Sequence, residues 1–196
     1  MIQRFENRQD MAKHFIKPGM KICEIGIFMG EFARFLHSLE PSELVLIDPF
    51  EEWCYSGNQD GNHGMTVYLP LVYEYMRADF AREFNIKIER GLSGDVLPKL
   101  PDDHFDFIYI DGDHSYLGVK RDLLLSSKKI KSGGILAGHD YAVNKAKCWE
   151  NYNFGVQQAV NEFCAEEGWE IIALALDGCV SFALKKKARE GVIAAE

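Results

Sequence analysis

Short apolar runs alternate along the chain with segments whose apolar residues recur at helical spacing. Such runs are typical of buried strands, and the segments between them of helices that cover a sheet. Strands are expected at 21–26, 44–48, 86–90, 105–111, 134–138, 169–175 and 180–184. Helices are expected at 30–38, 69–84, 115–130 and 154–167. The pattern predicts an α/β fold with a doubly wound, mostly parallel seven-stranded sheet that ends in an antiparallel hairpin at the Asp177-Gly178 turn.

The chain of 196 residues is long enough for one good-sized core, and we expect a single domain over 1–187. Residues 49–84 are predicted to form an insert, because 49–64 mixes aromatic residues with turn formers and shows no period. Four of its side chains would suit a lid over a ligand pocket, namely Trp53, Tyr55, His63 and Tyr68. Residues 188–196 are expected to be a flexible tail.

The acidic composition narrows the choice of partners. A formal net charge of -8 repels phosphate backbones and anionic lipid surfaces, so we expect a small-molecule partner rather than nucleic acid or a membrane. The apolar runs are too short to span a bilayer and the first ten residues lack the core of a signal peptide, which predicts a cytoplasmic protein. The apolar face of residues 11–16 would suit a homodimer contact. The five cysteines form no C-x-x-C pair, which disfavours a thiolate zinc site.

A glycine turn follows the first predicted strand and contains Glu24, Gly26, Phe28 and Gly30. Glycines let the backbone approach a ligand closely where a helix begins. The turn lacks the G-x-G-x-x-G pattern of dinucleotide sites, and Glu31 would repel a pyrophosphate at the helix start. A cofactor without phosphates, such as S-adenosylmethionine, tolerates these acids through its ammonium and sulfonium groups. The alternative is a plain tight turn.

Two further strand ends carry polar residues that suit a nucleoside. Asp48 follows the glycine turn by about twenty residues, the spacing at which a carboxylate accepts hydrogen bonds from ribose hydroxyls. Ser93 and Gly94 follow the third strand, where a hydroxyl and backbone amides can read an adenine edge. For Ser93, the role of a helix cap is an equal alternative.

The most informative residues follow the fourth and fifth predicted strands. Asp111, Asp113 and His114 follow one strand, and His139 and Asp140 follow the other. Asp111, His139 and Asp140 would supply a divalent metal with oxygen and nitrogen ligands, and His114 would act as a general base beside Asp111. Singly, each of these residues has a structural explanation as a cap or a buried histidine. Together, their buried like charges would require a compensating cation.

With these motifs, the chain resembles the class I S-adenosylmethionine-dependent methyltransferases, and within them the small metal-dependent O-methyltransferases of the catechol, caffeoyl-coenzyme A and macrolide-sugar type. The resemblance covers about 21–184. EIGIFMG is similar to the first cofactor motif of that family, LVLIDPF to its ribose-binding strand end and GLSGDVLPKL to its adenine-side segment. FDFIYIDGDHSY and GGILAGHDY resemble the paired metal and catalytic motifs. The resemblance implies a Rossmann-like methyltransferase sheet.

The resemblance also implies roles for residues. Glu24, Gly26, Phe28, Gly30, Asp48, Ser93, Gly94 and Asp111 fall on cofactor-binding positions. Asp111, His139 and Asp140 fall on the metal ligands, and His114 falls on the catalytic base. His139 replaces an expected carboxylate, so the identity of the metal, Mg²⁺ or Mn²⁺, stays open.

The implied activity is metal-assisted O-methylation of a small hydroxylated molecule, sugar-like or catechol-like. Two alternatives stay open. One is a metal-dependent hydrolase or oxygenase that uses Asp111, His114 and His139. The other is a non-catalytic module that binds S-adenosylmethionine.

Overall fold

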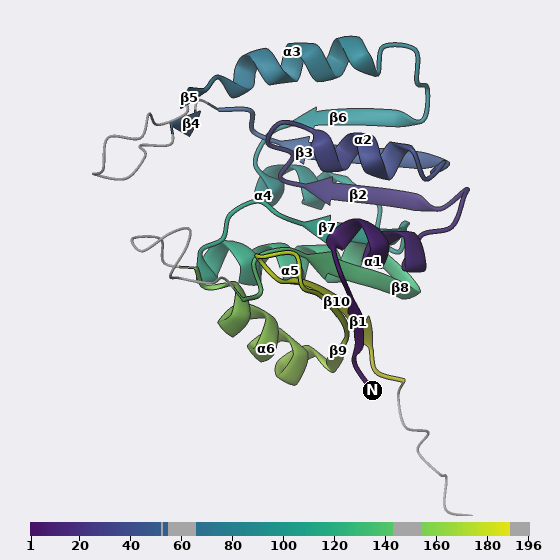
Figure 1. Cartoon of the computed structure of the whole chain (residues 1–196), viewed down its shortest axis with the longest axis vertical. Helices are drawn as coiled ribbons and strands as arrows, with labels where there is room; N and C mark the ends of the chain where they lie inside the picture. Colours follow the sequence, from purple (N-terminus) through teal and green to yellow (C-terminus); the bar gives the residue numbers. More distant parts are fainter. Residues whose placement is uncertain (52, 55–65, 143–153, 189–196) are drawn as a thin grey trace, which may run out of the picture.

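The computed structural model describes residues 1–51, 53–54, 66–142 and 154–188, and most of its strands form one large twisted sheet flanked by helices (Figure 1). The sheet has eight strands in the order β1-β9-β10-β8-β7-β2-β3-β6. Their bounds are Gln3–Phe5 (β1), Lys21–Ile25 (β2), Glu43–Asp48 (β3), Ile86–Arg90 (β6), Phe105–Ile110 (β7), Ile130–Gly138 (β8), Trp169–Ala175 (β9) and Ser181–Lys186 (β10). Only β10 runs opposite to its neighbours β8 and β9, and the other pairs are parallel.

The order of the central strands creates a crevice for a ligand. From β2 the chain first builds the sheet outward through β3 and β6, and then returns to place β7 on the other side of β2. Connections therefore leave β2 and β7 in opposite directions, and the carboxyl ends of these two strands border a topological switch point. In open α/β sheets, ligands bind at such a point.

Helices cover both faces of the sheet, in two layers with separate cores. One layer holds α1 (Arg8–Phe15), α2 (Glu31–His37) and α3 (Leu69–Asp79). The other holds α4 (Ser93–Val96), the short 3-10 helix η1 (Leu97–Lys99), α5 (Tyr116–Lys129) and α6 (Val156–Glu167). The strands serve both layers because successive side chains alternate. In β3, Leu44 and Leu46 face the first layer, while Val45 and Ile47 face the second.

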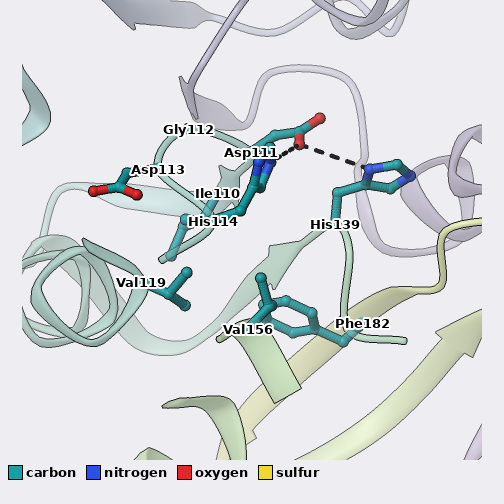
Figure 2. A pocket seen from close by; sticks show the side chains of 9 residues that line it. All are labelled: Ile110, Asp111, Gly112, Asp113, His114, Val119, His139, Val156 and Phe182. Atoms are coloured by element: carbon teal, nitrogen blue, oxygen red, sulfur yellow. Dashed lines mark hydrogen bonds and ion pairs between the residues drawn. The ribbon is translucent and has the colours of Figure 1, made fainter. Parts of the chain in front are cut away.

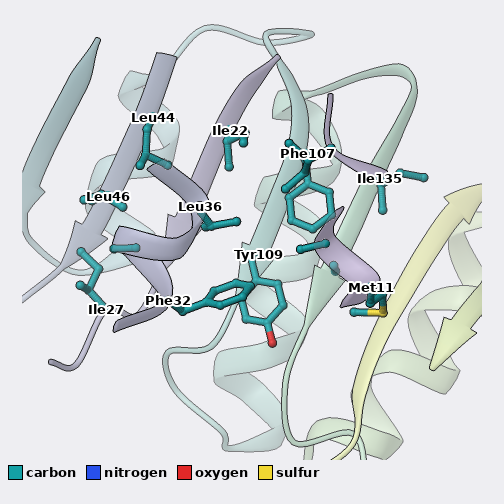
Figure 3. Close-up of a cluster of buried hydrophobic side chains, with 14 of the residues drawn as sticks. Met11, Ile22, Ile27, Phe32, Leu36, Leu44, Leu46, Phe107, Tyr109 and Ile135 are labelled. Atoms are coloured by element: carbon teal, nitrogen blue, oxygen red, sulfur yellow. The ribbon is translucent and has the colours of Figure 1, made fainter. Parts of the chain in front are cut away.

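The first core layer ties α1 and α2 to the middle of the sheet (Figure 3). Phe32 of α2 packs against Tyr109 of β7 with ring centroids 4.4 Å apart. Met11 of α1 lies in the same layer and is fully buried. Burial of a side chain of this size contributes about 2 kcal/mol. Met11 and Ile16 pack inside their own chain, so these two side chains do not form an exposed face, and the expected homodimer stays a prediction.

The structure confirms the predicted α/β class and the terminal hairpin, and it adds an eighth strand. The added strand is β1, whose three residues pair with β9 at the sheet edge and are too short to form a readable pattern. The helix predicted to reach residue 84 ends at Asp79, because Ala81 and Glu83 donate to carbonyls three residues back and turn the chain toward β6. β8 begins at Ile130 rather than at residue 134.

The insert at 49–84 is described in part. It contains a short antiparallel pair, β4 (Trp53–Cys54) and β5 (Thr66–Val67), followed by α3. Tyr55 and His63 of the expected lid lie outside the described residues, as do residues 189–196 of the expected tail. In the described part of the chain, no helix combines the length and the apolar character that a membrane span needs.

Candidate functional site

Gly26 brings the carboxyl ends of β2 and β7 into contact. Its φ is +84°, and a Cβ at this position would lie 2.1 Å from the backbone oxygen of Asp111. The amide of Asp111 donates to the carbonyl of Ile25 at 2.7 Å, which fixes the approach from the other strand. Only glycine allows this combination of conformation and distance. The first and fourth motifs found in the sequence therefore lie side by side at the switch point.

Asp48 locks the glycine turn against the end of β3. Its Oδ2 accepts hydrogen bonds from the amides of Ile27 at 2.8 Å and Phe28 at 3.3 Å, and its Oδ1 accepts one from Phe50 at 2.7 Å. The side chain is buried. The structure thus brings Asp48 and the Gly26 turn together, and gives Asp48 a structural task that sequence reasoning did not identify. Its contact with a ribose stays a prediction.

Glu24 supplies a buried carboxyl group, and one of its oxygens lacks a partner in the described part of the chain. The residue is 2% exposed, and its Oε2 has no hydrogen-bond partner among the described residues. Burial raises the pKa of Glu24 well above its usual range; the charges of Asp111 and Asp48 add to this, and Arg8 partly offsets it. A buried polar atom without a partner is costly. A ligand ammonium would satisfy it, so this residue fits the expected cofactor.

Gly30 and Phe28 complete the turn below this carboxyl. Gly30 has φ +77° and stands at the N-cap of α2, where a Cβ would meet the sulfur of Met76 at 2.3 Å. Phe28 adopts a left-handed φ of 52°, and its side chain is 42% exposed. Side chains rarely adopt this conformation, and such outliers cluster at ligand sites. The turn thus presents an aromatic ring at the edge of the crevice.

Ser93 sits at the start of α4, but its hydroxyl faces α5. It donates to Oδ1 of Asp122 at 2.6 Å and accepts from Arg121 at 3.2 Å. The N-cap of α4 is Leu92, so the predicted capping role of Ser93 is wrong. Gly94 is the next residue of the same helix. An adenine contact at Ser93 and Gly94 stays a prediction.

Four ionisable residues meet at the ends of β7 and β8. The parallel pairing of Ile110 with Gly138 aligns the two strand ends. Nε2 of His114 lies 3.4 Å from Oδ1 of Asp111 and 3.0 Å from Oδ2 of Asp140. Nδ1 of His139 lies 3.7 Å and 3.4 Å from the same two oxygens. Figure 2 shows both rings directed at one oxygen of Asp111.

These contacts shift the protonation of the cluster. Burial lowers the pKa of His114, but hydrogen bonds to Asp111 and Asp140 outweigh it and raise the pKa to about 10. Burial lowers the pKa of His139 as well, but its hydrogen bond to Asp140 and the charge of Asp111 outweigh this effect and raise the pKa. Burial raises the pKa of Asp140, yet its bonds to the two histidines prevail and hold it well below its usual range. Asp140 also has a left-handed φ of 59°, a strained conformation of the kind found at functional sites.

The cluster offers the donor set for a metal ion. One ligand atom each from Asp111, His139 and Asp140 lie within 4.8 Å of one another, close enough to contact a single cation. Two carboxylates with one imidazole suit Mn²⁺ well and Mg²⁺ less well. A cavity of about 10 Å³, just large enough to admit one water molecule, adjoins the cluster. It is lined by Ile110, Asp111, Gly112, Asp113, His114, Val119, His139, Val156 and Phe182 (Figure 2).

Asp113 takes no part in this cluster, although it lies between two of its members. Its side chain points away from the histidines (Figure 2). Its Oδ1 accepts a hydrogen bond from the amide of Ser115 at 2.9 Å, just before α5 begins. Ser115, where the sequence predicts that this helix begins, is the N-cap of α5. The structural explanation therefore holds for Asp113.

Sequence reasoning missed Arg8. Its guanidinium Nη1 lies 3.1 Å from Oδ2 of Asp111, on the side of the carboxylate that faces away from the histidines. Asn7 at the N-cap and Asp10 in the first turn are a start signal for α1, which contains Arg8. No local pattern tells that its side chain reaches β7. The compensating cation that the buried carboxylates require is thus supplied in part by the protein.

Comparisons with known proteins match this architecture. Residues 23–141, more than half of the chain, match the family model Methyltransf_24, a methyltransferase domain. A curated relative is the uncharacterized protein R132 of Acanthamoeba polyphaga mimivirus, which is 26% identical over 174 residues that cover 83% of this chain and 67% of R132. The range that matches the family model includes the glycine turn, Asp48 and the cluster at the ends of β7 and β8, but not Arg8.

Solved structures share the fold at low sequence identity. A protein described as an rRNA methylase from Clostridium thermocellum has a TM-score of 0.63 at 14% identity, over 92% of this chain and 93% of that one. A protein described as a caffeoyl-CoA O-methyltransferase from Staphylococcus aureus has a TM-score of 0.62 at 15% identity, over 90% and 82%. The methyltransferase SMU.1697c of Streptococcus mutans, solved with SAH, has a TM-score of 0.60 at 10% identity, over 91% and 95%. With the family match across its strand-end motifs, the chain belongs to the class I S-adenosylmethionine-dependent methyltransferases.

Proposed function

We propose that the protein transfers the methyl group of S-adenosylmethionine to a hydroxyl oxygen of a small molecule, sugar-like or catechol-like, with His114 as general base and a divalent metal held by Asp111, His139 and Asp140. One observation carries the proposal. Nε2 of His114 lies within 3.4 Å of carboxylate oxygens from two different strand ends, Asp111 and Asp140, beside the glycine turn. This contact supports the proposal, because it holds the imidazole beside the glycine turn with two carboxylates that can stabilise its protonated form.

The chemistry needs few groups from the protein. The acceptor oxygen attacks the sulfonium methyl carbon, so that a C–O bond forms while the C–S bond breaks. The hydroxyl proton passes to the imidazole of His114, and the sulfonium becomes a neutral thioether. Asp111 and Asp140 stabilise the imidazolium that results. A divalent ion, when bound, would polarise the acceptor oxygen and lower its pKa.

The acidic groups suit the cofactor expected here. Glu24 offers a buried oxygen, Oε2, which has no partner among the described residues, to the ammonium of the methionine part. Asp48 keeps the Gly26 turn in shape. Its Oδ2 already accepts two amides, but its Oδ1 accepts only one and retains a lone pair for a ribose hydroxyl.

The acceptor is proposed as a small molecule because of charge. Relatives of this fold include proteins described as an rRNA methylase and as a caffeoyl-CoA O-methyltransferase, so the fold leaves the acceptor open. A net charge of -8 weighs against a polyanionic substrate. Family membership favours methyl transfer over the hydrolase or oxygenase alternative.

A module that binds the cofactor without catalysis is the second candidate. The raised pKa of His114 favours it, because an imidazole that stays protonated at neutral pH cannot accept a proton. The two candidates agree on cofactor binding and differ in turnover. A test must therefore measure both quantities on the same protein.

Calorimetry with S-adenosylhomocysteine, with and without Mn²⁺, would measure cofactor affinity, and methyl transfer to a panel of vicinal diols and catechols would measure turnover. We expect His114→Ala to lower turnover by about 10²–10⁴-fold and to keep cofactor affinity within about twofold. The matched control is His37→Ala, which removes an α2 histidine that pairs with Glu83 at 3.6 Å. Turnover equal to wild type in His114→Ala would rule out the base, and binding without turnover on any acceptor would favour the silent module.

A further inference from the structure

The contact between Arg8 and Asp111 places a permanent cation against a proposed metal ligand. Nη1 of Arg8 lies 3.1 Å from Oδ2 of Asp111, with 23% and 20% of the two side chains exposed. The family match begins at residue 23, so Arg8 belongs to a segment outside it. The pair therefore joins a residue outside the matched range to a residue inside it.

Arg8 is held in this position from several sides. Its backbone amide donates to Oδ2 of Asp177 at 2.9 Å, in the turn between β9 and β10. Its guanidinium lies 4.7 Å from the centroid of the Phe32 ring. Just before it, β1 pairs with β9 in the main sheet. These contacts make Arg8 a fixed part of the site, unlike a long side chain on an open surface.

A metal ion and Arg8 would both bind the carboxylate of Asp111. Oδ1 of Asp111 faces the histidines and the candidate metal ligands, while Oδ2 faces Arg8. A divalent cation at Asp111, His139 and Asp140 would then lie one carboxylate away from the guanidinium. Like charges at that separation repel strongly in a half-buried site, where solvent screens them little. The repulsion lowers the affinity for the metal.

We propose that Arg8 and a divalent cation compete for the charge of Asp111, so that the N-terminal segment sets the metal affinity of the active site. The inference rests on the metal part of the proposed function. It assigns to Arg8 a task that differs from catalysis, because the arginine acts through Asp111. By linkage, a bound metal weakens the hold of Asp111 on Arg8 to the same extent.

Calorimetric titration of the full-length protein with Mn²⁺ tests the proposal without any turnover. Arg8→Met removes the charge and keeps much of the side-chain length, and we expect it to tighten Mn²⁺ binding about tenfold or more. Arg8→Gln removes the charge but keeps a hydrogen-bond donor, and it should also tighten Mn²⁺ binding. This variant replaces Arg8→Met in the test if Arg8→Met does not fold. Arg8→Lys keeps the charge and should stay within about threefold of wild type. Arg4→Met makes the same change at an exposed position on β1 and should not alter affinity.

The outcomes separate this inference from the proposed function. Unchanged or weaker Mn²⁺ binding in both Arg8→Met and Arg8→Gln, in protein that binds S-adenosylhomocysteine normally, would overturn the role of Arg8 alone. Mn²⁺ binding to the neutral variants but not to wild type would support competition in its strongest form. Absence of Mn²⁺ binding in every variant would overturn both the metal assignment and this inference, while the methyl-transfer assay would still decide the activity.

Discussion

The two halves of the crevice are built in different ways. On the cofactor side, at the ends of β2 and β3, the contacts are backbone hydrogen bonds to one carboxylate, Asp48, and a glycine that no other residue can replace. On the acceptor side, at the ends of β7 and β8, side chains hold one another through charge. Histidines, carboxylates and Arg8 supply those contacts. The first half has one arrangement, and the second can change with protonation and ligands.

This difference predicts different kinds of sensitivity. Backbone bonds and close contacts fail when the covalent structure changes, and hardly respond to solution conditions. Ion pairs that include histidine respond to pH and to added cations. Mutations on the cofactor side should therefore cost folding and binding together, whereas changes on the acceptor side should alter charge-dependent properties and leave the fold intact.

The largest effect is expected from Gly26→Ala. The added methyl group would lie 2.1 Å from the backbone oxygen of Asp111, so β2 and β7 would have to separate at the switch point. We expect a loss of about 3 kcal/mol or more in the free energy of unfolding, measured by urea denaturation. Calorimetry should find S-adenosylhomocysteine binding weakened at least about a hundredfold, since the turn can no longer keep its shape.

Gly19→Ala is the matched control for this substitution. Gly19 has a φ of +83°, nearly that of Gly26, but a Cβ there would meet no atom within 4 Å. Gly19→Ala should lower the free energy of unfolding only by the backbone strain, about 1 kcal/mol, and should leave cofactor affinity unchanged. Equal losses in the two variants would mean that backbone conformation, and not the contact between β2 and β7, explains the need for glycine at position 26.

An intermediate effect is expected from pH, on the acceptor side. Although burial lowers the pKa of His114, its carboxylate partners raise it from 6.5 to about 10. The contacts of His114 with these carboxylates therefore stabilise the fold fully below about pH 6.5, and this contribution is lost as the pH rises through 10. Asp140 has a lowered pKa, so its contribution to the free energy of unfolding is present above pH ~4 and is lost as the pH falls further. In metal-free protein, we expect the free energy of unfolding at pH 6 to exceed that at pH 9 by on the order of 1 kcal/mol.

Urea denaturation at the two pH values, in wild type and in His114→Gln, measures this contribution. The difference between pH 6 and pH 9 should shrink in His114→Gln, because the variant has no imidazolium for Asp111 and Asp140 to stabilise. His37→Gln should keep the wild-type difference, since its partner Glu83 lies away from the cluster. An identical pH dependence in wild type and His114→Gln would show that the cluster does not hold the proton that its geometry favours.

The fold was predictable where patterns are long, and the cofactor side was predictable where residues are adjacent. The β7 run FDFIYI and the Asp177-Gly178 turn are strong local signals, and both elements form where expected. β1 has three residues and depends on its pairing with β9, a contact that no local pattern encodes. The closeness of Gly26 and Asp48 followed from the rule that parallel strands end at one edge.

The acceptor side shows the limit of that reasoning. Strand order alone places Asp111 near Asp140, because β7 and β8 pair in register. The cation beside Asp111 comes from Arg8, 103 residues away in the chain, and reaches it only because α1 packs on the sheet. An arginine in a polar N-terminal segment gives no sign of that contact. Long-range ion pairs depend on tertiary packing, which residue patterns do not specify.

The smallest effect is expected from Asp113→Asn, a test of which carboxylates belong to the acceptor side. Asp113 points away from the histidines (Figure 2), and it accepts a hydrogen bond from the Ser115 amide that an asparagine oxygen can also accept. We expect urea denaturation to find a change below about 0.5 kcal/mol and calorimetry to find unchanged Mn²⁺ affinity. Asp111→Asn, the same change two residues earlier, should weaken Mn²⁺ binding about tenfold or more, because it removes a ligand charge. Equal losses of Mn²⁺ affinity in both variants would mean that net charge at the ends of β7 and β8, and not the geometry around His114, governs what this half of the crevice binds.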